Sequence, residues 1–151
     1  MLELARPCDR KAVNALAKQI HDLHVSWRPD IFEPAEEMYP EERFRDAVQQ
    51  RQLYVARVGG LIAGYALLKM RSYDWPGVVR RKVMEVEELC VDENCRGQGI
   101  GTEMLAEIRA LAKAFGCTDL QLSVYPQNDD AVCFYQKCGF TIRTIGMQRK
   151  V

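Results

Sequence analysis

The sequence has no excess of charge of either sign, because 21 Lys and Arg residues balance 21 Asp and Glu residues. A nucleic-acid-binding domain usually presents a basic face, and the largest basic cluster here is the short run Arg80–Lys82. Long hydrophobic runs are also missing, since the longest, Leu61–Leu68, is far shorter than the roughly 18 residues of a membrane helix. We therefore expect no nucleic-acid partner and no membrane partner.

The sequence is also poor in the patterns that bind structural metals. Its six cysteines form no C-x-x-C pair, and its only histidines are His21 and His24, so we expect no metal. The cysteines are expected to serve as small apolar residues in a reducing compartment. The N-terminus lacks the basic start and the apolar stretch of a secretory signal, which leads us to expect a cytoplasmic protein.

What is present is the composition of a globular domain, with 48% apolar and 28% charged residues over 151 positions. We expect residues 1–151 to form one mixed α/β domain, in which Asp9 caps the first helix and Gly59-Gly60 closes a β-hairpin. The expected strands cover residues 2–6, 53–58, 61–70, 82–91, 120–124 and 140–147. The expected helices follow Asp9, begin at Pro40, contain residues 104–115 and cover residues 129–138; residues 71–79 are expected to be a loop.

A glycine-rich segment, Arg96–Thr102, stands between an expected strand and an expected helix. Free backbone N–H groups and the helix dipole at such a place favour an anion. A dinucleotide fingerprint would require glycine where the chain has Thr102, and the Gly-Lys-Ser/Thr of a Walker loop is absent. The segment is therefore a candidate phosphate cradle of another kind, and the alternative is a plain tight turn.

A second motif, Asn128–Phe140, follows the next expected strand. Taken together, the two motifs resemble the GNAT superfamily of acyl-CoA-dependent N-acetyltransferases. The R-x-x-G-x-G/A loop of that family matches Arg96, Gly99 and Gly101, and its N…A…FY…GF pattern matches the second motif. The resemblance implies a GNAT-type acyl-CoA N-acyltransferase fold, with a central mixed twisted sheet and helices on both faces.

The resemblance implies acetyl-CoA as cosubstrate, bound between the strand that ends near Val91 and residues 119–125. The main chain there would pair with the pantetheine arm, and the glycine-rich loop would hold the pyrophosphate. Asn128 would contact the cofactor arm, although an Asn at a helix start is equally well explained as an N-cap. The implied cofactor-binding residues are Leu89, Cys90, Val91, Arg96, Gly97, Gln98, Gly99, Ile100, Gly101, Thr102 and Asn128.

The implied chemistry needs a base and an acid. An alkyl amine of pKa near 10.4 is neutral in only about one molecule in a few thousand at pH 7, so a base or a water relay must take its proton. The segment Glu87–Val91 resembles the acidic strand of the spermidine/spermine N-acetyltransferases, which makes Glu87 the expected base, with Glu85 as second candidate. The alternative for these acids is a solvated edge or ion pairs with residues 80–82. Tyr135 matches the family tyrosine that protonates the leaving thiolate, and a core tyrosine is its alternative.

The acceptor is expected to be a polyamine or another small cationic amine, drawn by a cluster of acids at positions 36, 37, 41, 42, 85, 87 and 88. Trp27, Phe32, Tyr39, Tyr73 and Trp75 could form an aromatic wall beside it. Alternatives within the class are a protein N-terminus or lysine, an aminoglycoside or an amino-acid derivative. A non-catalytic acyl-CoA-binding module is the alternative outside it. A homodimer is expected only by analogy with this fold.

Overall fold

The computed structural model describes all of residues 1–151 and contains a five-stranded sheet in the order β1-β2-β3-β4-β5. The strands are β1 (Leu2–Leu4), β2 (Leu53–Val58), β3 (Leu61–Tyr73), β4 (Arg81–Val91) and β5 (Asp119–Leu122). The helices are α1 (Arg10–Trp27), α2 (Glu41–Gln49), α3 (Ile100–Ala114) and α4 (Asp129–Lys137), with 3₁₀ turns at Pro7–Asp9 and Glu93–Cys95. Only β4 and β5 are parallel, so the sheet is mixed, as expected. No helix is both long and apolar enough to span a membrane.

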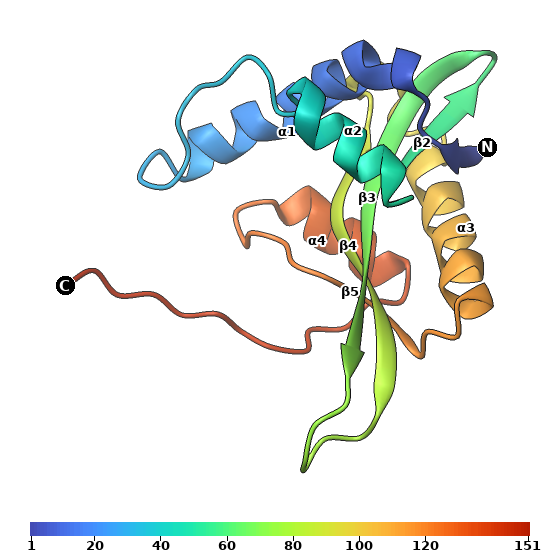
Figure 1. The fold of residues 1–151 in the computed structure, drawn as a ribbon. Coiled ribbons are helices and arrows are strands. Elements are labelled where there is room, and N and C mark those ends of the chain that lie inside the picture. The colour runs from blue at the N-terminus through green and yellow to red at the C-terminus, as the bar shows by residue number, and fades with distance from the viewer.

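Helices cover both faces of the sheet (Figure 1). On one face, α1 and α2 pack on β2 and β3 around buried residues such as Val13, Phe44 and Tyr65. On the other face, α3 packs around Met104 and Ile108, and residues of α4 pack against the same cluster. Burial from both sides explains the nearly continuous apolar run of β3. The mixed α/β fold with helices on both faces is therefore confirmed.

The hairpin between β2 and β3 also has the predicted turn. Gly59 and Gly60 adopt φ angles of 57° and 83°, and positive φ at both central residues defines a type I′ turn, which glycine adopts without steric cost.

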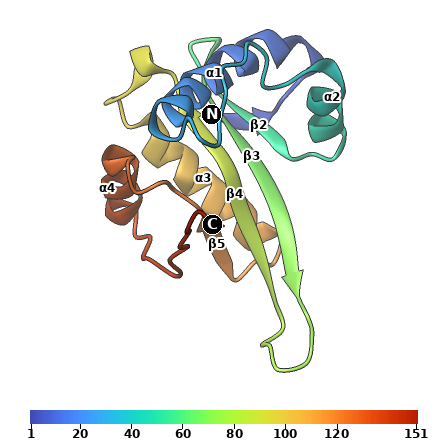
Figure 2. The ribbon, with the colours of Figure 1, turned by 90° about the vertical axis from the view of Figure 1, so that its left-hand side faces the viewer.

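The hairpin between β3 and β4 is longer than predicted. Pairing continues to Tyr73 and Arg81, so only residues 74–80 connect the strands and the expected loop 71–79 is wrong at its start. The tip projects well beyond the rest of the sheet (Figures 1 and 2). Exposed polar residues at this end, such as Ser72, weaken the hydrophobic alternation that identifies a strand, although the main-chain ladder continues.

The expected strand at residues 140–147 is not formed within this chain. Residues 139–151 contain no helix or strand and extend away from the body (Figure 1). Their apolar side chains are therefore left exposed, with 73% exposure at Ile142 and 95% at Met147. The strand β5 is also shorter than expected, because it ends at Leu122 rather than at Val124.

Asp9 occupies the expected N-cap position of α1, but its side chain does not cap that helix. The carboxylate is 4% exposed and accepts hydrogen bonds from Arg57 Nη2 at 2.7 Å and from the Arg6 backbone N–H at 2.8 Å. Burial alone would raise the pKa of Asp9, but Arg57 and the Arg6 N–H lower it below the ordinary value. The residue therefore joins the start of α1 to β2 as a buried ion pair.

Candidate active site

The strands β4 and β5 separate along their length. They pair only from Val83↔Asp119 to Val86↔Leu122, while β4 continues to Val91 with its other edge still bound to β3. The main chain of residues 87–90 therefore has an edge that no strand covers, on the side where β5 has diverged. Leu89 and Cys90, two of the residues expected to pair with pantetheine, lie on this stretch, and Val91 follows it with its carbonyl oxygen bound by Arg96 Nε.

The glycine-rich loop follows the free end of β4 and leads into α3. Gly97 and Gly99 have φ angles of 75° and 81°, a left-handed conformation that favours glycine. Gly99 is the N-cap of α3 and supplies no side chain to its first turn. The first intrahelical bond is donated by Glu103 to the Gly99 carbonyl at 3.0 Å. The N–H groups of residues 100–102 are thus free to bind an anion at the positive end of the helix.

Two polar side chains of this loop, those of Arg96 and Gln98, bind main-chain carbonyl groups. Arg96 is exposed, and its Nε donates to the Val91 carbonyl oxygen at 3.1 Å, which places its positive charge at the end of β4. The Gln98 amide is 3.5 Å from the Asn94 carbonyl oxygen. Arg96 is therefore the one cation of the segment, beside the helix start.

The two sequence motifs meet at Gly101. A Cβ atom at this position would lie 3.0 Å from Phe134 Cζ and 3.5 Å from Val91 Cγ2. The absence of a side chain thus allows α3, α4 and the end of β4 to pack at one point. This contact explains why a glycine at the start of one helix occurs together with a Phe-Tyr pair on another.

Asn128 is the N-cap of α4, and its Oδ1 accepts a hydrogen bond from the Ala131 N–H at 3.2 Å. The capping interpretation of this residue is confirmed. Its contact with the cofactor stays a prediction.

Tyr135 lies on α4 between two aromatic rings, with centroids 5.3 Å from Phe134 and 5.7 Å from Phe140. Burial raises the pKa of its phenol to about 12, with smaller contributions from Cys138 and Cys90. Burial likewise raises the pKa of the Cys90 thiol to about 12. Both groups are therefore held in their protonated forms at neutral pH.

The acids of β4 are arranged by a β-bulge. Leu67 pairs with Glu88, but its neighbour Leu68 pairs with Val86, so Glu87 is the extra residue. A bulge turns adjacent side chains toward the same side of the sheet. Glu87 and Glu88 accordingly both meet residues of the face that carries α2, and both do so just after the last pair with β5.

All three acids of β4 are paired, as the cost of burying free carboxylates requires. Glu87 Oε2 lies 2.7 Å from Lys69 Nζ, and Arg71 binds both Glu87, at 3.6 Å, and Glu85. The expected alternative, pairing with residues 80–82, is wrong. Arg80 instead pairs with Asp74 at 3.2 Å and Arg81 with Asp119 at 3.6 Å. Lys82 donates a hydrogen bond to the Phe115 carbonyl oxygen at 3.1 Å.

The sequence did not indicate the surroundings of Glu88. Its Oε2 accepts hydrogen bonds from the hydroxyls of Tyr39 at 2.8 Å and Tyr65 at 2.7 Å, and its Oε1 binds Arg43 at 2.7 Å. Burial and the charge of Glu88 raise the pKa values of both tyrosines, which keeps them as donors. The three partners come from separate elements, so no spacing in the sequence could have indicated this cluster.

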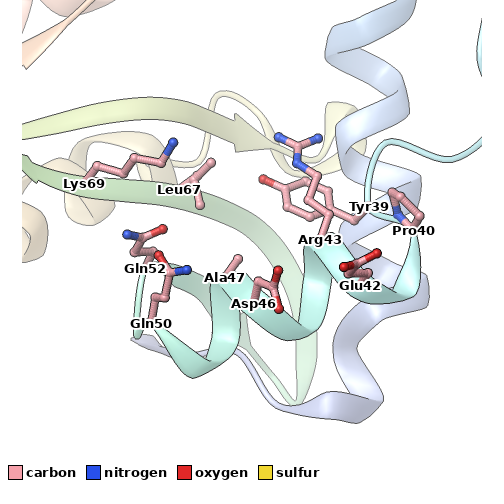
Figure 3. Close-up of a pocket in the computed structure, with 10 residues that line it drawn as sticks. All are labelled: Tyr39, Pro40, Glu42, Arg43, Asp46, Ala47, Gln50, Gln52, Leu67 and Lys69. Atoms are coloured by element: carbon pink, nitrogen blue, oxygen red, sulfur yellow. The ribbon is translucent and has the colours of Figure 1, made fainter.

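A cavity of ≈ 500 Å³ lies beside this cluster, between α2 and β3 (Figure 3). Arg43 crosses its wall with the guanidinium 4.2 Å from the centre of the Tyr39 ring, and Lys69, the partner of Glu87, lines its far end. The other lining residues are Pro40, Glu42, Asp46, Ala47, Gln50, Gln52 and Leu67. Both signs of charge are therefore present, which suits an acceptor that carries more than one polar group.

The expected aromatic wall is divided in the structure. Phe32 stacks on His24 at 5.2 Å, with Trp27 at 5.8 Å and Tyr125 at 5.4 Å from the same imidazole. Burial, with the neighbouring His21, lowers the pKa of His24. Tyr39 is instead a core residue, and Tyr73 and Trp75 pack on one another at the tip of the β3–β4 hairpin, 5.2 Å apart. A single wall of these five aromatic residues is wrong, because the long hairpin carries two of them away.

Ion pairs also weaken the negative field expected from the cluster of seven acids. Glu36 lies 3.6 Å from Lys18, and Glu37 binds Arg10, while the three acids of β4 have the basic partners described above. Of the seven acids, only Glu41 and Glu42 form no ion pair with a basic side chain. The field at the site is therefore much weaker than the count of acids suggests.

The fold and the free edge of β4 are those of an acyltransferase, and comparison with known proteins identifies the family. The family model described as the acetyltransferase (GNAT) family matches residues 17–140. The chain belongs to the GNAT acetyltransferase family.

Among solved structures, a single-substitution mutant of the BH1408 protein from Bacillus halodurans is 30% identical, with a TM-score of 0.95 over 100% of this chain and 99% of that one. The aminoglycoside N-acetyltransferase AAC(6')-Iy, solved in complex with CoA, shares the fold with a TM-score of 0.70 at 17% identity, over 100% of both chains. The thialysine N-epsilon-acetyltransferase of Mus musculus is 32% identical over 81 residues, which are 54% of this chain and 45% of the mouse protein. The chain thus spans less than half of that curated relative.

Proposed function

We propose that this protein transfers the acetyl group of acetyl-CoA to a primary amine by direct attack. The observation that carries the proposal is the separation of β4 from β5 after Val86, with the uncapped start of α3 at the open end. The free edge fits an amide-rich chain such as pantetheine, and the helix start fits a pyrophosphate. The CoA complex of AAC(6')-Iy, which has the same fold, supports this assignment.

The main chain of residues 89–91 holds the pantetheine arm as a neighbouring strand would. Residues 97–102 direct their N–H groups to the pyrophosphate, with Arg96 as the accompanying cation. Asn128 orders the start of α4 and so fixes the opposite wall. Most of these contacts use the backbone. The main chain of residues 89–91 also holds the thioester carbonyl, and Glu87 lies two residues before this segment on the same strand.

Glu87 takes the proton of the acceptor ammonium, through water. It lies on the bulge, directly after the last pair of β4 with β5, and its carboxylate is 2.7 Å from Lys69 and 3.6 Å from Arg71. Glu85 shares Arg71 and is the second candidate. Glu88, held by two hydroxyls and Arg43, serves instead as a fixed negative charge that orients the ammonium.

Tyr135 protonates the departing sulfur. As the amine nitrogen bonds to the carbonyl carbon and the C–S bond breaks, the phenol hydrogen passes to sulfur, giving free CoA thiol. The nitrogen gives up its second proton to water as the amide forms, and water returns a proton to the Tyr135 phenolate, so that one proton in all is released to solvent when Glu87 gives up its own. A phenol of pKa about 12 is protonated throughout the neutral range. The thiolate released with the C–S bond is the base that accepts this proton.

The acceptor is a small amine, and the polyamine expected from the sequence remains the first candidate. The mixed charge of the cavity beside Glu88 makes an amino-acid-like amine the second candidate acceptor. The similarity to a thialysine acetyltransferase supports testing this class of amine. Protein N-termini, protein lysines and aminoglycosides complete the range of acceptors to be tested.

The test measures thermal unfolding with acetyl-CoA and then thiol release with an amine panel. A ligand at 100 times its Kd adds about 2.7 kcal/mol, which is several degrees for a domain of this size. The panel contains spermidine, putrescine, thialysine, lysine, an aminoglycoside and an N-terminal peptide. Stabilisation with release for one amine supports the enzyme, whereas stabilisation without release for any would favour the non-catalytic acyl-CoA-binding module. No stabilisation would overturn the proposal.

A further inference from the structure

The residue that follows the end of α2, Arg51, has a strained backbone. Its φ angle is 56°, and it is the only residue other than glycine with a positive φ. The Arg51 N–H donates to the Val48 carbonyl at 3.0 Å, and the Gln52 N–H donates to the Ala47 carbonyl at 2.9 Å. These two bonds form a Schellman motif with Arg51 at the C′ position, where the left-handed conformation favours glycine.

The other two helices that end in this way have glycine at the same position. Gly116 follows α3 with φ 73°, and Gly139 follows α4 with φ 89°. A side chain in the left-handed conformation destabilises the backbone relative to glycine, and strain of this kind is found where a residue has a function. The turn itself does not need the Arg51 side chain, so we ask what that side chain contacts.

The Arg51 side chain lines a second cavity, of ≈ 280 Å³, on the face of the sheet that carries α3. The cavity is mainly apolar, and two of its apolar residues, Met70 and Phe115, are 53% and 43% exposed, so it opens to solvent. Methionine side chains adapt to ligands of different shape. The other lining residues are Gln50, Gln52, Tyr54, Leu68 and Met84.

Arg51 is the only charged residue of this second cavity. The arginines of α2, Arg43 and Arg45, lie beside Glu88 and Asp46, whereas Arg51 forms no ion pair. Burial raises the pKa of Tyr54, and the positive charge of Arg51 opposes this rise, which indicates that the guanidinium lies near the phenol at the cavity wall. An apolar cavity with one unpaired cation and no acid complements an anion that has an apolar body.

We propose that the second cavity binds a small monocarboxylate whose body is a ring or a short alkyl chain. The Arg51 guanidinium donates paired hydrogen bonds to the carboxylate, and the apolar body lies on Met70 and Phe115. Gln50 and Gln52 line this cavity and also the cavity beside Glu88 (Figure 3), so the bound carboxylate contacts the segment that borders both. The proposal does not depend on acetyl transfer.

The experiment titrates 3-phenylpropionate into the full chain and follows the backbone amide resonances by NMR. Saturable shifts are expected at residues 50–52, at Met70 and at Phe115. Shifts centred on Arg43 and Lys69 would overturn the proposal, because the carboxylate would then lie in the cavity beside Glu88. An absence of saturable shifts would overturn it as well.

Two further probes test the two halves of the ligand separately. The amide 3-phenylpropanamide keeps the ring and has no charge, and acetate keeps the charge and has no apolar body. Each should bind about tenfold or more weakly than 3-phenylpropionate, since each loses one of the two sets of contacts. Equal affinity of 3-phenylpropanamide and 3-phenylpropionate would overturn the assignment of Arg51 as the group that selects the ligand.

The variant Arg51→Gly separates the site from the fold. Glycine relieves the left-handed strain, so Tm should not fall below that of the wild type, while the Kd for 3-phenylpropionate should rise about tenfold or more. The control, Arg45→Met, removes an exposed arginine of α2 that does not line the cavity and should leave this Kd unchanged. An unchanged Kd in Arg51→Gly, or an equal rise in both variants, would overturn the proposal.

Discussion

The two sides of the candidate active site are built from different parts of the chain. The proposed acetyl-CoA side consists of the free edge of β4, the loop 96–99 and the first turn of α3, and its expected contacts come mainly from the backbone. The proposed acceptor side consists of side chains from the segment before α2 and from α2, β3 and β4, joined by ion pairs and hydrogen bonds such as those at Glu88.

The difference shows which features of a site leave a trace in the sequence. A backbone site needs particular conformations, and glycines at fixed spacing supply them, as Gly97 and Gly99 do with their positive φ angles. A side-chain site needs particular residues at particular points in space, which can come from anywhere in the chain. The first kind is visible as a motif, and the second is visible only in the fold.

The largest expected effect is that of Tyr135→Phe on the acetyl-CoA side. Loss of the proton donor should lower kcat by about 100-fold or more, while acetyl-CoA binding is retained because the ring still packs between Phe134 and Phe140. Steady-state kinetics and calorimetry provide the two measurements. The control is Tyr54→Phe, a buried tyrosine of β2 whose pKa is also raised by burial. An unchanged kcat at every pH would remove Tyr135 as the acid.

The next effect, on the acceptor side, is that of Glu87→Gln. We expect kcat/KM to fall by roughly 30-fold at pH 7 and to recover toward the wild-type value as the pH approaches the amine pKa near 10.4, where no base is needed. Asp74→Asn, which breaks an ion pair with Arg80 at the hairpin tip, is the matched control. A loss that stays constant with pH would assign Glu87 a structural role and would make Glu85→Gln the next variant to measure.

A smaller effect is expected when the backbone of the acetyl-CoA side is strained. Gly99→Val places a β-branched residue at φ 81°, which costs about 1–3 kcal/mol and should raise the Kd for acetyl-CoA by about tenfold. Gly59→Val introduces comparable strain at φ 57° in the β2–β3 turn and should lower stability without changing that Kd. Equal Kd values for both variants would show that the conformation of Gly99 does not matter for the cofactor.

Asp9→Asn should lower the stability of the whole domain and should affect both sides of the candidate active site equally. Removing one partner of the buried pair with Arg57 should cost roughly 3 kcal/mol of unfolding free energy at pH 7. Because the folded state lowers the pKa of Asp9, its contribution is complete above the ordinary pKa of about 4 and is lost as the pH falls through the folded value. Urea unfolding at pH 7 and pH 3 should therefore show the wild type and the variant converging in acid.

The smallest effect is expected for Trp75→Ala. Its ring is exposed at the hairpin tip and packs on Tyr73, away from the other aromatic group around His24. Stability should change by less than about 0.5 kcal/mol, and the kinetic constants should not change. A marked rise in KM for the acceptor would instead show that the hairpin tip takes part in acceptor binding.

The sequence could predict elements whose cause is local. The Gly59-Gly60 turn, the apolar run of β2 and the helix face of α3 each depend on neighbouring residues. The predicted C-terminal strand is wrong because residues such as Ile142 and Ile145 show only that a segment can pair, and not that an edge of the same sheet receives it. The capping role predicted for Asp9 is wrong because the same carboxylate can cap a helix or pair with a cation. The position of Arg57 on β2 decides between these two roles. The cluster at Glu88 could not be predicted for the same reason.

The β-bulge at Glu87 has a consequence for how the gene can change. Leu68 pairs with Val86 and Leu67 with Glu88, so deletion of the Glu87 codon would keep both pairs and turn the bulge into a regular ladder. Side chains on a regular strand alternate between faces, so Glu88 would still face Tyr39 and Tyr65, and Val86 and Leu89 would still face the apolar cluster under α3. An in-frame deletion here would thus remove one carboxylate from the proposed acceptor side without turning the core residues of β4, whereas deletion of Val86 or Glu88 would turn their neighbours to the opposite face.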